Sequence, residues 1–199
     1  MDYQCYTYCP SGAERLPYHI LDAQEQMLPP IKRWARLLLR QELAARLGKA
    51  PQKIQFFRNE HGKPFVEGVH FNISHSGNKL CMAFHTSPIG VDIQQCLKKN
   101  SISKLAAHIM CPQQLQHFTD NGCRPQEFYT CWCISEALVK YYGESIWKAQ
   151  TYPFILHHHG IEFLFEQAPD VELFRPAEGY CGALAYKHTA CRHRVQGVE

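Results

Sequence analysis

The sequence of 199 residues lacks several features that assign a protein to a class at once. No apolar run approaches the roughly 18 residues that span a bilayer. Residues 1–6 contain neither the basic nor the apolar segment of a secretory signal. No low-complexity or strongly charged tract indicates disorder. We therefore expect a globular cytoplasmic protein that does not act at a membrane.

A large excess of charge of one sign is also missing, because 21 Lys and Arg oppose 18 Asp and Glu. The resulting net charge of +3 is too small for a protein that holds nucleic acid by neutralising phosphates, so we expect no nucleic-acid partner. Ten cysteines are present, but the absence of paired CxxC elements argues against a structural zinc site. We expect these thiols to be reduced, and four of them read as core residues: Cys81, Cys131, Cys133 and Cys181.

Helical periodicity is clearest in residues 31–47, where apolar positions recur on one face. Gly48 follows at the position of a C-terminal cap. On another face Lys32, Arg36 and Arg40 recur every four residues. The spacing alone fits a solvated basic face as well as a face that binds an anion.

Short apolar segments separated by turn-forming residues predict strands. The predicted strands cover residues 54–57, 71–73, 80–84, 89–93, 161–165, 171–174 and 181–186, and two further helices cover about 101–118 and 125–142.

Residues 77–85 resemble residues 179–188, since both place a strand of small residues after a glycine. The pattern favours an α+β fold of two similar halves, residues 1–88 and 89–199, related by a pseudo-twofold. Each half is then a small, mainly antiparallel sheet with packed helices, and the active site lies at their interface.

Three short motifs carry side chains suited to phosphate chemistry. Asp92 stands in an apolar strand, where a carboxylate needs a cation, a metal or several donors. Glu136 and Lys140 lie one helical turn apart, a pattern that alone is typical of a surface ion pair. Ser74 and His75 follow a strand, where hydroxyl, imidazole and backbone donors can converge on an anion. Neighbours on an extended segment point to opposite faces, which disfavours the rival hypothesis of a serine hydrolase.

In this order the motifs resemble the signature of 4'-phosphopantetheinyl transferases of the surfactin-synthetase-activating type. The matching segments are residues 71–76, 90–94 and 132–140, the Gly-Lys-Pro turn at residues 62–64, and residues 36–39. The resemblance implies a Mg²⁺-dependent enzyme that transfers the phosphopantetheine arm of coenzyme A to a serine of an apo acyl or peptidyl carrier protein. The product that leaves is 3',5'-ADP. The alternative is a non-catalytic module on the same fold that binds coenzyme A or the carrier.

The same resemblance implies roles for individual residues. It makes Asp92, Glu136 and Gln94 the metal ligands; Arg36, Lys63, Ser74, His75 and Lys140 the contacts to coenzyme A; and Asp92, Glu136 and Lys140 the catalytic group. Glu136, acting directly or through a water, is the candidate base for the carrier serine. Two positions depart from the family pattern: Gln94 replaces a second acid of many relatives, and Ser135 replaces a lysine.

Two remaining patterns have a structural interpretation. The consecutive histidines 157–159 cannot all face one ion in regular structure, so we expect a solvated loop. An apolar face formed by Ile102, Leu105, Ile109 and Leu115 belongs either to the core or to a groove for the carrier. Because two similar halves can build a cleft within one chain, we expect a monomer.

Overall fold

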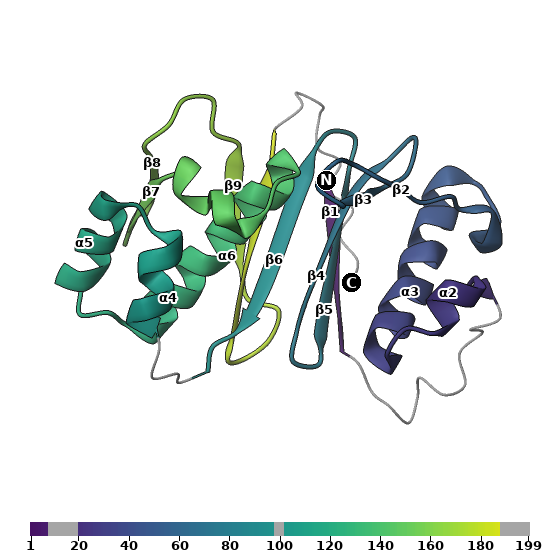
Figure 1. The fold of residues 1–199 in the computed structure, drawn as a ribbon, viewed down its shortest axis with the longest axis horizontal. Coiled ribbons are helices and arrows are strands. Elements are labelled where there is room, and N and C mark those ends of the chain that lie inside the picture. The colour runs from purple at the N-terminus through teal and green to yellow at the C-terminus, as the bar shows by residue number, and fades with distance from the viewer. Residues whose placement is uncertain (8–19, 98–101, 188–199) are drawn as a thin grey trace, which may run out of the picture.

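The computed structural model describes residues 1–7, 20–97 and 102–187, which form two halves side by side (Figure 1). The first half contains β1 (Asp2–Thr7), α2 (Ala23–Gln26), α3 (Pro30–Leu47), the 3-10 helix η2 (Pro51–Lys53), β2 (Phe57–Arg58), β3 (Pro64–Phe65), β4 (His70–Ser76) and β5 (Lys79–His85). The second half contains β6 (Ile89–Gln95), α4 (Ile102–Ile109), α5 (Pro112–Asp120), α6 (Pro125–Tyr142), the 3-10 helix η3 (Ile146–Thr151), β7 (Phe154–His157), β8 (Gly160–Phe163), β9 (Asp170–Phe174) and β10 (Tyr180–Tyr186).

Both halves contain a three-stranded antiparallel sheet with the same arrangement of strands. The orders are β1-β5-β4 and β6-β10-β9, so in each sheet the last strand of the sequence lies in the middle. In each half a long helix and a short hairpin, β2–β3 or β7–β8, separate the first strand from the second. The predicted α+β architecture with small antiparallel sheets is confirmed, and the two segments that resemble each other supply the central strands β5 and β10.

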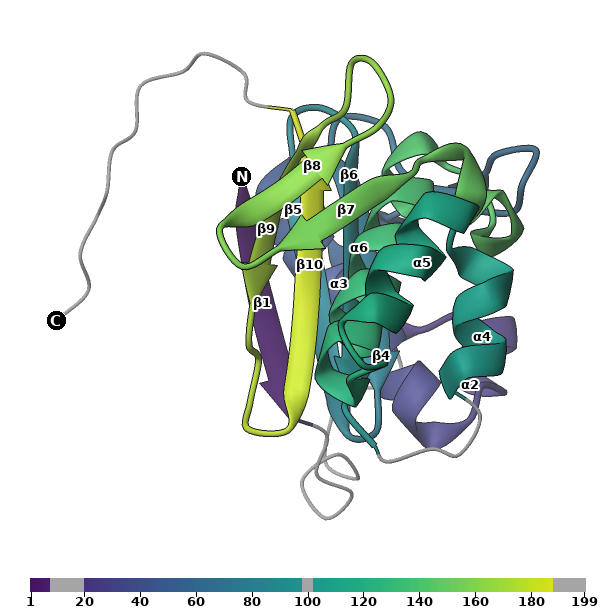
Figure 2. The same ribbon diagram turned by 90° about the vertical axis from the view of Figure 1, so that its left-hand side faces the viewer.

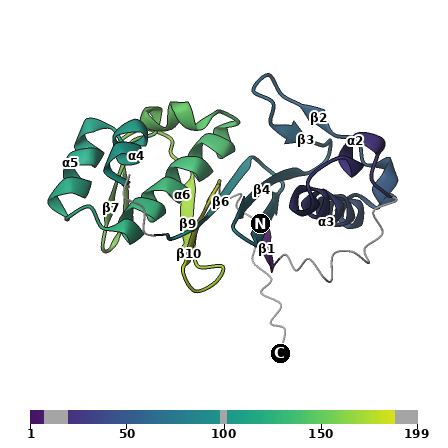
Figure 3. The same ribbon diagram turned by 60° about the horizontal axis from the view of Figure 1, so that its bottom comes forward.

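The long helices α3 and α6 each pack beside one sheet (Figure 3). Both begin with a proline, whose missing N–H has no partner in the first turn in any case. They end at Gly48 and Gly143, whose φ angles of 61° and 78° are left-handed and therefore suit glycine. Both predicted helices and their ends are confirmed.

Some predicted elements are wrong in extent. The helix predicted at residues 101–118 is two helices, α4 and α5, because Pro112 cannot donate a helical hydrogen bond and instead starts a new helix after Cys111. Residue 101 itself lies outside the described residues. Only the last residue of the strand predicted at 54–57 lies in β2. The edge strand β1 was not predicted, since most of its side chains are exposed and give no apolar pattern.

The histidine run is only partly a loop, because His157 ends β7 while His158 and His159 form the turn to β8. Helices α4, α5 and α6 all lie on one side of the β6-β10-β9 sheet (Figure 2). The apolar face at residues 102, 105, 109 and 115 packs into the core of this half, so the core alternative holds for it. Within the described ranges, no helix combines the length and the apolar character needed to cross a membrane.

Buried side chains form one large core in each half, a third between the two sheets, and a small separate cluster of Ile20, Leu21 and Leu37. The core between the sheets joins residues of β5, β6 and β10, among them Cys81, Val91 and Leu184. The four cysteines predicted as core residues are all buried and free. The sheets are thus held together by apolar contacts as well as by the polar contacts described below.

Gly90 allows α6 to approach β6 closely. A Cβ atom at this position would lie 1.9 Å from the carbonyl oxygen of Ala137 and 2.6 Å from the backbone nitrogen of Tyr141. Both atoms belong to the backbone of α6 and cannot turn aside. This contact brings Glu136 and Lys140 of α6 next to Asp92, two residues after Gly90.

Candidate active site

A cavity of about 430 Å³ lies where the halves meet. Its wall includes residues from α3, β4, β6 and α6. Seven of the eight residues implied by the resemblance line it: Arg36, Ser74, His75, Asp92, Gln94, Glu136 and Lys140. Lys63 does not. The apolar part of the wall, which includes Leu28, Ala35 and Leu80, was not foreseen, because its residues look like ordinary core positions in the sequence.

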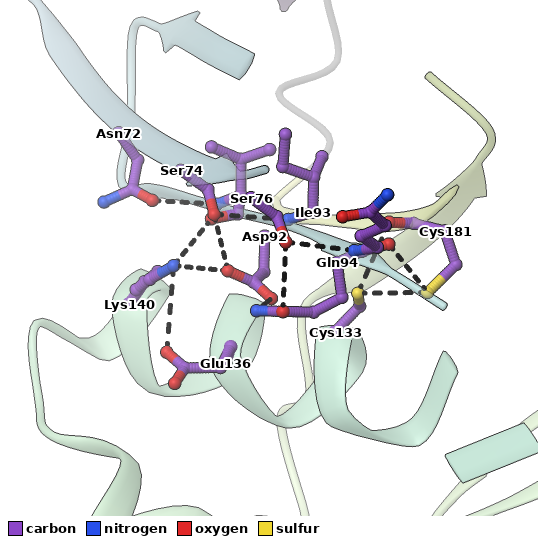
Figure 4. A network of polar contacts seen from close by, with 12 residues as sticks. Asn72, Ser74, Ser76, Asp92, Ile93, Gln94, Cys133, Glu136, Lys140 and Cys181 are labelled. Atoms are coloured by element: carbon purple, nitrogen blue, oxygen red, sulfur yellow. Dashed lines mark hydrogen bonds and ion pairs between the residues drawn. The ribbon is translucent and has the colours of Figure 1, made fainter. Parts of the chain in front are cut away.

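Asp92 is the most enclosed polar group of the site, with 2% of its surface exposed. Its Oδ1 accepts a hydrogen bond from Ser74 Oγ at 2.6 Å and lies 2.7 Å from Lys140 Nζ. Its Oδ2 accepts from Gln94 Nε2 at 3.1 Å (Figure 4). The buried carboxylate therefore has a cation and two neutral donors, which agrees with the prediction that a carboxylate in an apolar strand needs such partners.

Lys140 places one ammonium group between two carboxylates. Its Nζ pairs with Asp92 at 2.7 Å and with Glu136 Oε2 at 3.7 Å, and donates to the carbonyl of Val91 at 3.2 Å. Burial alone would lower the pKa of Lys140, but Asp92 and then Glu136 outweigh it and raise the pKa. Burial raises the pKa of Glu136 more than Lys140 lowers it. Glu136 and Lys140 are therefore more than a surface ion pair of α6, because Lys140 also contacts Asp92 and Val91 of β6.

Ser74 and His75 are neighbours on β4 but differ in surroundings. Ser74 is buried, and its hydroxyl accepts from the N–H of Ile93 at 3.2 Å while donating to Asp92. His75 is exposed and lines the cavity. Among the described residues no hydrogen bond joins Ser74 to His75. The serine hydrolase hypothesis is therefore unsupported, because this hydroxyl has no histidine base.

The basic side chains of α3 divide into two groups. Arg40 is only 5% exposed and binds Glu25 Oε2 at 2.7 Å, so it is a structural residue. Arg36 Nε pairs with the other Glu25 oxygen at 3.3 Å, and its guanidinium lies 4.4 Å from the ring centre of Phe56. Arg36 and Lys32 both line the cavity. The sequence could not predict this division, because both arginines pair with Glu25 and the even spacing along α3 does not show which side chain the fold buries.

Lys63 lies outside this cavity, at the C-terminal end of α6. Its Nζ donates to the carbonyl of Lys140 and, at 3.5 Å, to that of Ile89. Asn59 Nδ2 donates to the carbonyl of Gly143 at 3.2 Å, so the turn containing Lys63 caps the helix. Burial and, secondarily, the charge of Lys140 lower the pKa of Lys63 to about 8.

Replacing Lys63 with methionine is expected to change how stability depends on pH. The pKa of Lys63 falls from 10.5 to about 8 on folding, so between these values the unfolded chain binds more protons and stability rises with pH. The free energy of unfolding of the wild type minus that of Lys63→Met should grow by ~1–3 kcal/mol from about pH 7 to about pH 10.5. Urea denaturation measures this difference, and a difference that stays flat would contradict the burial of this amine.

The donor set fits a Mg²⁺ ion. Asp92 and Glu136 come from different elements, yet both contact the ammonium of Lys140, so the structure already accommodates a cation between them. Magnesium prefers oxygen ligands and commonly takes one or two carboxylates together with substrate phosphates and waters. Within the described ranges no three His, Cys, Asp or Glu side chains are grouped to hold a metal by themselves. Further ligands would therefore come from elsewhere, and Gln94 would have to turn its amide, since Nε2 now faces Asp92.

Gln94 and Ser135, the two residues that depart from the family pattern, lie in different surroundings. Gln94 lines the cavity and contacts Asp92 directly. Ser135 is buried, at 2% exposure, and does not line the cavity. The serine itself is therefore not part of the cavity wall.

Comparison with known proteins matches both halves of the chain. Residues 88–191 match the family model of the 4'-phosphopantetheinyl transferase superfamily, and residues 22–87 match the model "4'-phosphopantetheinyl transferase, N-terminal". A 4'-phosphopantetheinyl transferase of Bacillus subtilis is 30% identical over 134 residues, 65% of this chain and 56% of the relative. One from Aneurinibacillus migulanus is 32% identical over 115 residues, 56% and 47% of the two chains. One from Bacillus pumilus is 25% identical over 195 residues, 95% and 79%.

The chain spans about half the length of the first two of these relatives. The superfamily match alone covers more than half of the chain and includes β6 and α6, which carry Asp92, Glu136 and Lys140. The chain belongs to the 4'-phosphopantetheinyl transferase superfamily.

Proposed function

We propose that the chain transfers the 4'-phosphopantetheine moiety of coenzyme A to a serine of an apo acyl or peptidyl carrier protein and releases 3',5'-ADP. One observation carries the proposal: Asp92 of β6 and Glu136 of α6 share the ammonium of Lys140 in a cavity between the halves. The transferase names of the relatives support the same reaction. Because the cavity is built within one chain, we propose a monomer, and we place the reaction in the cytoplasm.

Coenzyme A is the substrate whose charge fits this wall. Lys32, Arg36, His75 and Lys140 all line the cavity, so cationic and imidazole groups surround the space that a diphosphate would enter. The volume of about 430 Å³ lies within the range of small-molecule sites. Lys63 supports this wall indirectly through the carbonyl of Lys140, without lining the cavity.

Mg²⁺ would be held by Asp92 and Glu136, with the amide oxygen of Gln94 as a neutral third ligand. When bound, it would neutralise negative charge on the diphosphate. Lys140 supplies a second positive charge at the same place, because its pKa is raised and the amine stays protonated. It can therefore stabilise the charge that develops on the leaving phosphate.

Glu136 is the better placed of the two carboxylates to accept the proton of the carrier serine. Both oxygens of Asp92 already accept hydrogen bonds, from Ser74, Lys140 and Gln94. The ion pair described for Glu136 is the longer one, at 3.7 Å to Lys140. As the serine oxygen forms its bond to the β-phosphorus, its proton would pass to Glu136, and the bond to the ADP oxygen would break.

A transfer assay tests this function against the non-catalytic alternative. The protein is incubated with coenzyme A, Mg²⁺ and apo carriers from fatty acid, polyketide and peptide synthesis, and each carrier is weighed by mass spectrometry. We expect one phosphopantetheine to be added to at least one carrier, and none to a carrier whose acceptor serine is replaced by alanine. Binding of coenzyme A without transfer to any carrier would favour the binding module.

A further inference from the structure

The edge of β6 that faces the first half is closed by side chains. On its other edge β6 pairs with β10 through the backbone. On the edge towards β4, the backbone N–H groups of three alternate residues of β6 donate to side-chain oxygens of β4. These bonds are Val91 to Asn72 Oδ1 at 3.0 Å, Ile93 to Ser74 Oγ at 3.2 Å, and Gln95 to Ser76 Oγ at 3.0 Å. We call Asn72, Ser74 and Ser76 the β4 ladder.

The ladder follows from the sequence of β4. Alternate residues of a strand point to the same face, so Asn72, Ser74 and Ser76 share one side while β4 pairs with β5 along its backbone. Asn72 and Ser74 are 8% and 7% exposed, so water is largely excluded from this junction. An N–H group of β6 that lost its partner here would be left unsatisfied.

Both serines of the ladder bind β6 in the same two-fold manner. Each hydroxyl accepts from a backbone N–H and donates to the side chain of the preceding residue of β6. Ser74 donates to Asp92 at 2.6 Å, and Ser76 donates to Gln94 Oε1 at 3.4 Å. Gln94 in turn donates to Asp92, so Ser76 reaches Asp92 through one intermediate (Figure 4).

We propose that Asn72 and Ser76 are positioning residues of the transfer reaction, which fix β6 against β4 and thereby hold Asp92 in place at the cavity. Neither residue lines the cavity, whereas the intervening Ile73, Ser74 and His75 do. Their effect on the reaction is therefore exerted through β6. This proposal rests on the proposed function.

Hydrogen exchange tests the ladder without reference to activity. In Ser76→Ala the amide of Gln95 should exchange at least ~10-fold faster than in the wild type, and in Asn72→Leu the amide of Val91 should do so. Ser76→Thr keeps the hydroxyl and should restore slow exchange. Ser87→Ala is the matched control, because its hydroxyl bonds to His85 within a turn and its loss should leave both amides unchanged. Unchanged exchange in Ser76→Ala and Asn72→Leu would overturn the ladder.

Kinetics test the positioning role. Ser76→Ala and Asn72→Leu should lower kcat by ~10-fold or more while changing the KM for coenzyme A less than ~3-fold, because the cationic wall is untouched. Ser76→Thr should recover kcat to within ~3-fold. Faster exchange with unchanged kcat would overturn the positioning role. Absence of transfer by the wild type would instead contradict the proposed function, while the exchange experiment would still decide whether the ladder exists.

Discussion

Asp92→Asn is expected to lower kcat/KM for phosphopantetheine transfer by ~10³-fold or more. Asparagine fills the same space but removes the charge that pairs with Lys140, and it replaces one of the two accepting oxygens of Asp92 with an NH₂ group that can only donate. One charged ligand of the proposed ion is lost as well. Initial rates are measured by mass spectrometry of the carrier.

The matched control for this variant is Asp120→Asn. Asp120 is an exposed aspartate of α5 that accepts a hydrogen bond from Gln116, so its replacement should leave the rate within ~2-fold of the wild type. Thermal unfolding of both variants shows whether they are folded at the assay temperature. A folded Asp92→Asn protein that kept more than about a tenth of the activity would refute the role given to this carboxylate.

Gly90→Ala is expected to destabilise the protein by at least ~3 kcal/mol, or to prevent folding. The added Cβ would lie 1.9 Å from a backbone oxygen of α6, so the helix would have to move away from β6. Urea denaturation measures the loss. Because α6 carries Glu136 and Lys140, any folded fraction should also transfer phosphopantetheine poorly.

Gly182→Ala on β10 is the matched control for the clash. Its added Cβ would approach the ring of Phe174 at 2.6 Å, but a side chain can turn aside where the backbone cannot. We expect a loss of ~1–2 kcal/mol, clearly smaller than that at Gly90. Equal losses at both positions would show that close packing of α6 on β6 is not what makes Gly90 necessary.

Local chemistry made much of the fold predictable from the sequence. Gly48 and Gly143 follow long amphipathic segments, and both helices end there. The strands β5 and β10 could be predicted because each is a short, mostly apolar segment after a turn-forming glycine, and both are buried over nearly their whole length. The break before Pro112 could also be predicted, because proline commonly occupies the first position of a helix. The apolar periodicity on both sides of it instead indicated one continuous helix.

The partners within the site depend on tertiary contacts that spacing does not reveal. An apolar strand around Asp92 predicted that the carboxylate needs partners, but Lys140 lies 48 residues away and Ser74 lies 18 residues away. Arg36 and Arg40 of α3 both pair with Glu25 in another helix, yet Arg36 lines the cavity and Arg40 does not. The ladder residue Asn72 gave no signal of its own, because a buried asparagine has many possible partners.

The most direct test of the account is the binding of a divalent ion in the presence of coenzyme A, measured with Mn²⁺ by electron paramagnetic resonance. The account predicts one bound ion per chain, with affinity reduced by ~10-fold or more in Asp92→Asn and in Glu136→Gln alike, because both side chains would hold the same ion. Undiminished binding in either folded variant would contradict a shared site and, with it, the chemistry proposed for this cavity.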